Sequence, residues 1–390
     1  MRNHVRFCAP LMSLLVTTLG CDQGGGSVRV ETSDSAGVAI VTTHAPDVPV
    51  RASSTVLRTV GDQGGDTDAL YKVNSGNTAV DDRGNIYVLE WDAQRVHVFD
   101  STGARVRTLG KRGGGPGELQ FPLGLSVSGS GVVRVADVGK RKFVQWNSEG
   151  QLLEEIAFPQ RFTGGSVGWT DSGMVIPVWA VDGQRVVLLD GAGAEKTLAA
   201  VSGQKGKELK LKSCGMGFTN MKPIFSPDLI WAAAGDRVVI ARNPEYVIDE
   251  FVGGRLVRSI RRNVPPRAAT AEAAKASLGD AMRVRTDGGV RVCDVAEVVE
   301  QQGFAPHLPT IGRMTIAPDG GLWVQRYTVD KKAAAIDLFD SDGRYTGTID
   351  DGSIFPIAFL PDGRLLTTQT DELDVERLVI RTMKARGKRQ

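Results

Sequence analysis

Short runs of alternating apolar and polar residues dominate the chain between residues 78 and 110. Four such runs follow one another there, and Gly84 and Gly103 lie in the turns of that stretch. In a β-strand, successive side chains point to opposite faces, so a period of two indicates a strand with one face turned toward a core. The stretch therefore predicts four consecutive antiparallel strands.

The same pattern recurs along the rest of the sequence. Glycines recur in the turn between the first and second expected strands, at Gly84, Gly131, Gly173, Gly235, Gly320 and Gly363. The spacings are 47, 42, 62, 85 and 43 residues. A second set lies in the turn between the third and fourth strands, at Gly103, Gly150, Gly193, Gly254 and Gly343. A four-stranded unit that repeats at this period is typical of a β-propeller, so we expect an all-β, six-bladed propeller.

The two ends of the chain supply the parts of one blade. The last unit provides strands near residues 364–368 and 377–382 but no fourth strand, whereas residues 56–61 copy the fourth strand at residues 106–110 almost residue for residue. The N-terminal segment is expected to complete the last blade, because closure of the ring removes an exposed sheet edge. Residues 38–41 predict one further strand, whose partner the pattern does not identify.

The two oversized spacings contain insertions. They fall in the connections between blades, at residues 202–223 and residues 264–307, and the second contains helical patterns at residues 268–282 and 295–302. Interblade connections lie at the same end of a propeller as the loops between second and third strands, which we call the top face. We therefore expect a helical insertion between blades that rises from the top face, where loops on a rigid scaffold often carry binding sites.

The N-terminus is typical of an exported protein. Residues 1–20 have the positive start and apolar stretch of a signal peptide, and residues 21–27 form a polar, glycine-rich tether. The sequence Thr18-Leu19-Gly20-Cys21 resembles a bacterial lipobox, which would place a lipid on Cys21. Thr18 departs from that pattern, so ordinary signal-peptidase cleavage remains the alternative. The propeller is expected over residues 28–383, followed by a basic, disordered tail at residues 384–390.

Several segments resemble NHL-type repeats, among them the linker Gly113–Leu119 and the strand around Ile86–Val88. The opening residues 34–41 resemble those of bacterial six-bladed propeller lipoproteins. This resemblance implies the fold and a location in the cell envelope. It implies no single activity, because propellers of this type include binding platforms, scaffolds, lyases and hydrolases.

Cysteine and charge add further candidates. Within the expected propeller only Cys214 and Cys293 occur, one in each insertion; a disulfide and two separate buried thiols both fit. The net charge is +2, so the overall charge balance gives no indication of a nucleic-acid partner. Cations nevertheless collect in the expected top loops, where we identify a candidate ligand-binding set comprising Lys111, Arg112, Lys140, Arg141, Lys142 and Arg326. An anion-binding patch and an ordinary solvated surface both fit this set.

Catalytic signals are weak. Histidine 97 lies in an alternating strand and fits a packing role, and His44 and His307 show no metal-ligand spacing. The acidic residues Glu90, Asp92 and Asp137 lie in second-to-third-strand loops. The aromatic residues Trp91, Trp179 and Trp323, with Arg326 and Tyr327, lie at second-strand ends and could line a sugar or peptide groove. No catalytic residue, metal ligand or cofactor is assigned.

The expected function is that of an envelope-anchored, non-catalytic binding or scaffold propeller. Its basic top face would meet a protein, a peptide, a glycan or an anionic small molecule, and its membrane attachment would be the lipid anchor alone. The alternative is a metal-dependent lyase or hydrolase with the ion in the propeller pore. The number of metal-ligating side chains separates these two hypotheses, since the enzyme needs several carboxylate or histidine side chains around the pore.

Overall fold

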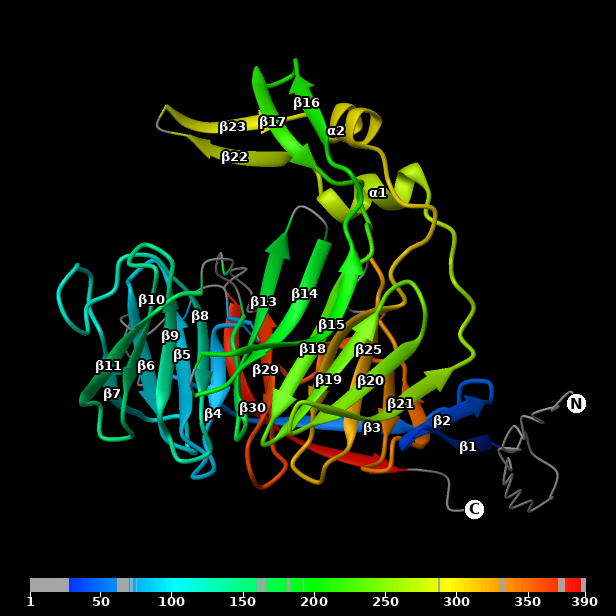
Figure 1. Ribbon diagram of the computed structural model, residues 1–390, viewed down its shortest axis with the longest axis horizontal. Helices are drawn as coiled ribbons and strands as arrows, with labels where there is room; N and C mark the ends of the chain where they lie inside the picture. The colour runs from blue at the N-terminus through cyan, green and yellow to red at the C-terminus, as the bar shows by residue number, and fades with distance from the viewer. Residues whose placement is uncertain are drawn as a thin grey trace, which may run out of the picture.

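The computed structural model describes residues 28–61, 70, 73–74, 76–159, 162, 166–180, 183–191, 193–286, 288–329, 334–370 and 376–386. The signal peptide, the tether and Cys21 therefore lie outside the described residues. Within these ranges the chain is a six-bladed β-propeller surmounted by a separate cap, which stands at the top of Figure 1. The expected all-β class and six blades are confirmed.

The first three blades each take four consecutive strands. Blade 1 consists of β4 (Thr78–Val80), β5 (Ile86–Glu90), β6 (Arg95–Phe99) and β7 (Arg105–Leu109). Blade 2 consists of β8 (Pro122–Val127), β9 (Val133–Asp137), β10 (Lys142–Trp146) and β11 (Leu152–Ala157). Blade 3 consists of β12 (Gly168–Thr170), β13 (Gly173–Ala180), β14 (Gly183–Leu189) and β15 (Glu195–Ser202).

Of the other three blades, blades 4 and 6 include strands of the N-terminal segment, whereas blade 5 takes four consecutive strands. Blade 4 consists of β18 (Leu229–Ala234), β19 (Arg237–Arg242), β20 (Val247–Val252) and β21 (Arg255–Arg262), extended by β2 (Val38–His44) and β1 (Arg29–Ser35). Blade 5 consists of β24 (Ile311–Ile316), β25 (Leu322–Arg326), β26 (Ile336–Phe339) and β27 (Tyr345–Ile349). Blade 6 consists of β28 (Ala358–Phe359), β29 (Leu365–Thr370), β30 (Glu376–Arg386) and β3 (Arg51–Thr59).

Alternating side chains hold neighbouring blades together. Ile86 and Val88 of β5 pack with Leu366 and Ile380 of blade 6, whereas their neighbours Tyr87 and Leu89 pack on the opposite face against blade 2. One buried cluster of this kind fills each of the six interfaces between adjacent blades. The period of two seen in the sequence is thus the period with which each blade contacts its two neighbours.

The N-terminal segment closes the ring and also contacts the outer edges of blades 4 and 5. Strand β3 pairs antiparallel with β30, with Val56 opposite Arg381, so the predicted closure is confirmed. Strand β2, for which the sequence offered no partner, pairs in parallel with β21 on the outer edge of blade 4. Between these strands, Pro49 forms a bridge with Thr348 on β27. The segment therefore forms a strap, residues 38–59, along the outer edges of blades 4, 5 and 6.

Three expected boundaries differ from the structure. Strand β30 continues to Arg386, because Arg51–Ser53 of the strap extend its ladder, so residues 384–386 are not a disordered tail. The helix expected at residues 268–282 is shorter: α1 (Ala271–Leu278) begins after the capping residue Thr270 and ends at Gly279. Alternating residues follow it and form the hairpin of β22 (Met282–Thr286) and β23 (Gly289–Cys293), which the sequence interpretation missed.

The cap is built from both insertions. The first contributes the hairpin of β16 (Lys207–Leu211) and β17 (Met216–Met221), which was expected only as a loop; the second contributes α1, the β22–β23 hairpin and α2 (Val295–Gln302). Leu209, Leu211 and Val298 are buried among these elements, away from the six blade interfaces. None of the described helices is both long enough and apolar enough to span a membrane.

Candidate functional site on the top face

Lys140 organises the basic region that the sequence places on blades 1 and 2. It lies in the loop between β9 and β10, and its side chain is only 6% exposed. The Nζ group donates to the carbonyl oxygens of Gly115 (2.9 Å) and Glu118 (3.1 Å), both in the connection between the two blades. It also pairs with the Glu155 carboxylate on β11. Lys140 thus holds this connection against blade 2 and does not face solvent.

Glu155 is the counter-charge of this region. Burial alone would raise the pKa of Glu155, but hydrogen bonds from Lys140, Lys142 and the Gly117 N–H lower it to about 2. The Lys142 Nζ lies 3.0 Å from Glu155 Oε2, and 43% of the Lys142 side chain remains exposed. The carboxylate therefore stays ionised at neutral pH and compensates part of the lysine charge.

The remaining cations of the region point outward. We call Lys111, Arg112, Arg141 and Lys142 the basic quadrant. Lys111 pairs with Glu118 at 3.2 Å but stays 78% exposed. Arg112 donates to the Asp92 carbonyl oxygen at 3.3 Å. Within the described part of the chain, neither Arg112 nor Arg141 forms an ion pair with a carboxylate. Lys111 and Arg112 thus belong to the connection that Lys140 anchors, and Arg141 and Lys142 directly follow Lys140 in the chain.

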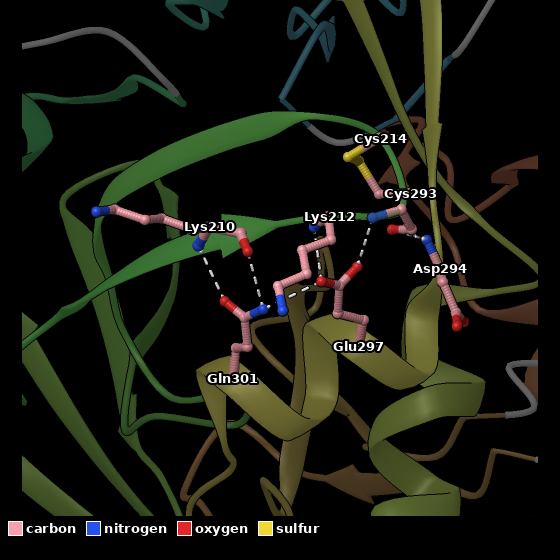
Figure 2. The surroundings of a disulfide bond; sticks show 8 residues. Lys210, Lys212, Cys214, Cys293, Asp294, Glu297 and Gln301 are labelled. Carbon is pink, nitrogen blue, oxygen red and sulfur yellow. Dashed lines mark hydrogen bonds between the residues drawn. A yellow bond between two sulfur atoms is a disulfide. The ribbon is translucent and has the colours of Figure 1, made fainter.

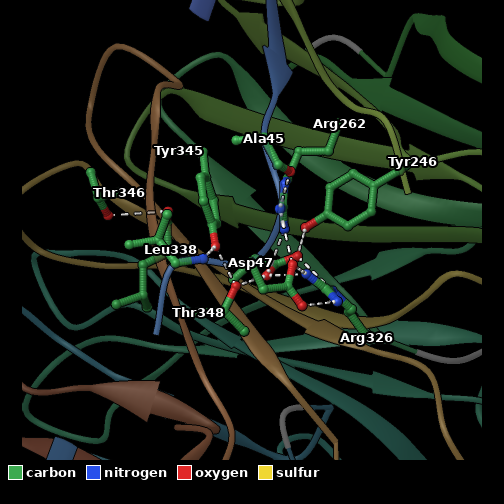
Figure 3. Close-up of polar contacts among 11 residues, drawn as sticks. Ala45, Asp47, Tyr246, Arg262, Arg326, Leu338, Tyr345, Thr346 and Thr348 are labelled. Carbon is green, nitrogen blue, oxygen red and sulfur yellow. Dashed lines mark hydrogen bonds and ion pairs between the residues drawn. The ribbon is translucent and has the colours of Figure 1, made fainter. Parts of the chain in front are cut away.

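Arg326 lies elsewhere, at the top of β25 between blades 4 and 5. Its guanidinium donates to Asp47 at 2.8 Å (Nη1) and to Asp337 at 2.9 Å (Nε). Arg262, with a side chain 1% exposed, approaches the same two carboxylates at 3.1 and 2.9 Å. Figure 3 shows Asp47 between the two arginines. Arg326 is therefore saturated by protein carboxylates and does not join the basic quadrant.

Asp47 and Asp337 link three parts of the molecule. Asp47 belongs to the strap, Asp337 to β26 of blade 5 and Arg262 to β21 of blade 4. Asp337 also accepts hydrogen bonds from the Tyr246 hydroxyl at 2.7 Å and from the Thr348 hydroxyl at 2.6 Å. A hydrogen bond from Arg326 lowers the pKa of Asp47, although its partial burial opposes this. Sequence reasoning missed this network, because its two arginines are 215 and 279 residues from Asp47 and its members show no local pattern.

A disulfide joins the two insertions of the cap. Cys214 and Cys293 are bonded with a Cα–Cα distance of 4.8 Å, across 79 residues of sequence. Figure 2 shows helix α2 beside this bond. The Glu297 carboxylate accepts from the Lys212 N–H (2.7 Å) and the Ser213 N–H (3.0 Å), and Gln301 bonds both backbone groups of Lys210. The cap is thus a covalently closed unit above the propeller.

The tryptophans named from the sequence have different environments. Trp323 is 8% exposed and packs in the interface between blades 5 and 6. Trp91 is partly buried. Trp179, at the top of β13, is 42% exposed, and the Nζ of Lys222 from the first insertion lies 5.1 Å from its ring centroid. Trp179 is therefore the most exposed of the three rings, and the Lys222 cation lies over it.

Three of the acidic and histidine candidates, Glu90, His97 and Asp137, are occupied by structural contacts. His97 is buried and lies 3.0 Å from Glu90 (Nε2 to Oε2), and burial lowers its pKa, which favours the neutral ring. Asp137 is fully buried and accepts the N–H groups of Gln120, Phe121 and Lys140, so it holds the turn. Across the described residues, no group of three or more histidine, cysteine or acidic side chains is arranged to hold a metal ion.

Comparisons with known proteins agree on the architecture. A family model described as a 6-bladed beta-propeller matches residues 74–166. A solved structure of a Bacteroides fragilis protein described as exported has a TM-score of 0.51 at 14% identity, covering 86% of this chain and 95% of that one. A member of the duf4221 family from Bacteroides vulgatus has a TM-score of 0.54 at 11% identity, covering 86% and 99%. No curated protein matches the sequence. At these identities the likeness establishes the propeller fold alone.

Proposed function

We propose that this propeller is a non-catalytic binding protein that holds an anionic ligand on its top face through the basic quadrant. The observation that carries the proposal is the pair Arg112 and Arg141. Both side chains are exposed and have no carboxylate partner among the described residues; Arg112 lies in the connection that Lys140 anchors, and Arg141 lies next to Lys140 in the loop between β9 and β10. An arginine that is fixed in position and free of protein acids can grip a carboxylate or phosphate with two parallel hydrogen bonds.

Position in the fold supports the same conclusion. The quadrant draws on the connection after blade 1 and on a loop of the adjacent blade 2, although Lys111 and Lys142 are 31 residues apart in the sequence. The β22–β23 hairpin of the cap extends toward the side of blades 1 and 2 in Figure 1 and carries Arg283, Arg285 and Arg291. Convergent charges of one sign raise the local concentration of an oppositely charged partner.

A labelled acidic peptide, such as fluorescein-deca-glutamate, tests the proposal by fluorescence anisotropy. The wild-type protein should bind it, and affinity should fall as salt rises, because exposed charges are screened beyond about 8–10 Å at physiological ionic strength. Reversal of both arginines, Arg112→Glu with Arg141→Glu, should abolish binding without changing the melting temperature. Neither side chain lies in a hydrophobic cluster.

A matched control uses arginines of the opposite face. Arg83 and Arg344 lie exposed in turns at the bottom of blades 1 and 5, so Arg83→Glu with Arg344→Glu changes the net charge equally. This control should keep most of the affinity. Binding that survives both the double reversal of the quadrant and high salt would show that the quadrant is only a solvated surface.

The proposed location is the cell envelope, with a lipid on Cys21 and residues 22–27 as the tether. The support is the sequence pattern and the export of the Bacteroides fragilis protein that shares the fold. Mass spectrometry of the membrane fraction should detect a diacylated N-terminal cysteine. A Cys21→Ser protein should appear in the soluble fraction; if it stays membrane-bound through detergent-free washing, lipid anchoring is wrong.

A further inference from the structure

A cavity of the top face lies at the base of the cap, lined by none of the residues of the basic quadrant. The cavity has a volume of about 220 Å³ and lies beside the ends of the second insertion and the top of β25. Its apolar wall is formed by Val264, Pro265, Ala334 and Ala335, and its polar side includes Arg267 and Tyr327. The volume is below the roughly 300–1,000 Å³ of drug-sized sites, so it suits a ligand of about one ring.

Backbone hydrogen bonds hold the walls in place. The Leu308 N–H donates to the Arg267 carbonyl oxygen and the Ala269 N–H to that of Pro306, both at 2.9 Å, so the two ends of the second insertion are joined. The Tyr327 N–H donates to the Thr310 carbonyl oxygen at 3.0 Å, which joins these ends to blade 5. The residues that face the cavity are therefore positioned by main-chain geometry.

Phe225, which follows the first insertion, supports the aromatic side of the cavity. Its ring meets that of Tyr327 edge to face, with centroids 5.9 Å apart and an interplanar angle of 71°. Its φ angle is 61°, in the left-handed region, which a bulky side chain rarely adopts. Such a conformation persists only where its surroundings enforce it, and these positions concentrate at binding sites. Here the bridge between Ile224 and Phe304 holds the adjacent backbone.

Among the described residues, the charges around the cavity do not cancel. Arg262 and Arg326 are balanced by the two carboxylates of Asp47 and Asp337. Arg267 is a third cation, and its side chain donates to the carbonyl oxygen of Tyr327. In the ranges that the structure describes, Arg267 forms no ion pair and no acidic side chain lines the cavity. Arg267 thus lines the cavity without a counter-ion among the described residues, and the donors of its guanidinium that Tyr327 does not use are available to a ligand.

We infer that this cavity binds a small aromatic carboxylate, whose carboxylate pairs with Arg267 while its ring lies against Tyr327 and the apolar wall. A guanidinium without a counter-ion favours a planar anion that accepts two hydrogen bonds. The aromatic ring of such a ligand packs well against tyrosine, valine and proline side chains. This site goes beyond the proposed function: it lies on blade 5 and the cap, and it takes a small molecule rather than an extended anion.

The test uses 4-fluorobenzoate as the probe, followed by ¹⁹F NMR on the full mature protein. Wild type should bind the probe, and 4-fluorobenzamide, which has the same shape without the charge, should bind at least about ten-fold more weakly, as for the loss of one charge-assisted contact. Arg267→Met should weaken the binding of 4-fluorobenzoate to the affinity of 4-fluorobenzamide for the wild-type protein. Arg267→Lys, which keeps the charge but not the planar fork, should give an intermediate affinity.

Controls separate this site from the fold and from the basic quadrant. Arg285→Met removes an exposed arginine of the β22–β23 hairpin and should leave probe binding unchanged. The double reversal at Arg112 and Arg141 should also leave it unchanged, so this proposal and the quadrant can fail independently. A circular dichroism melt of each variant checks folding. No binding by wild type, equal binding of the amide, or full binding by a folded Arg267→Met protein would each overturn the inference.

Discussion

The guanidinium of Arg262 lies 2.9 Å from the carboxylate of Asp337, and both side chains are 1% exposed or less. This pair connects the last strand of blade 4 to the third strand of blade 5. Arg326 and Asp47 complete it into a neutral group of two arginines and two aspartates, and Asp47 brings in the strap. The ring closure and the top face therefore share a buried electrostatic connection.

Removal of Asp337 should destabilise the protein strongly. Asp337→Ala removes the buried partner of Arg262 and leaves it the half-exposed Asp47 at 3.1 Å, and breaking a buried pair costs about 3–5 kcal/mol. Urea unfolding followed by circular dichroism measures the change. Asp342→Ala serves as the control, because Asp342 is largely exposed and pairs only with Arg344; it should stay within about 0.5 kcal/mol of wild type. Equal free energies of unfolding for the two variants would contradict a stabilising role for the network.

Acid should remove the contribution of Glu155 to the stability of the folded protein. Its pKa in the folded protein is about 2, below the ordinary 4.5, so the folded state binds the proton less readily than the unfolded chain. Its stabilisation is present above the unfolded value and is lost as the pH falls from about 4.5 toward 2.

Free energies of unfolding for wild type and Glu155→Gln should therefore differ at pH 6 and converge at low pH. Glu208→Gln, an exposed change on the cap, should match wild type within about 0.5 kcal/mol at pH 6. A gap between wild type and Glu155→Gln that stays constant down to pH 2 would show that the ion pairs with Lys140 and Lys142 contribute little.

Loss of the disulfide should loosen the cap and spare the blades. In the double variant Cys214→Ala with Cys293→Ala, the cap loses a cross-link whose removal typically costs about 2–5 kcal/mol. Because the cap cluster around Leu209 and Val298 is separate from the blade interfaces, the effect should be local. Hydrogen exchange with mass spectrometry should show faster exchange in residues 207–221 and 271–302, and wild type under a reducing agent should match the variant. Uniform loss of protection in all blades would contradict this.

Deletion of the strap should open the ring. Without residues 28–61, β30 loses its partner β3 and exposes an edge, which favours aggregation. The melting temperature should fall and light scattering should rise. Deletion of residues 28–37 alone is the matched control, since it removes β1 but keeps β2 on β21 and β3 on β30. A protein without the whole strap that melts like the full-length one would refute closure by this segment.

Local chemistry explains why the architecture follows from the sequence. Every turn glycine used to count the repeats, such as Gly84, Gly103 and Gly363, has a positive φ. Alternation along strands such as β5 sets both faces of a blade, and the copied segment at residues 56–61 identifies the closing strand. These signals act over a few residues, so the six blades and the closure could be predicted without coordinates.

The candidate sites depended on tertiary structure. Lys140, Lys142 and Arg326 look alike in the sequence as cations of top loops, yet Lys140 is buried on Glu155 and Arg326 is saturated by Asp47, from 279 residues away. Arg267 gave no signal at all. Whether a cation is free depends on which acids lie within a few ångströms of it and on how much water reaches it. Those distances arise only when blades, strap and cap pack together, so the sequence by itself determined the scaffold and only the folded chain decided which charges remain available.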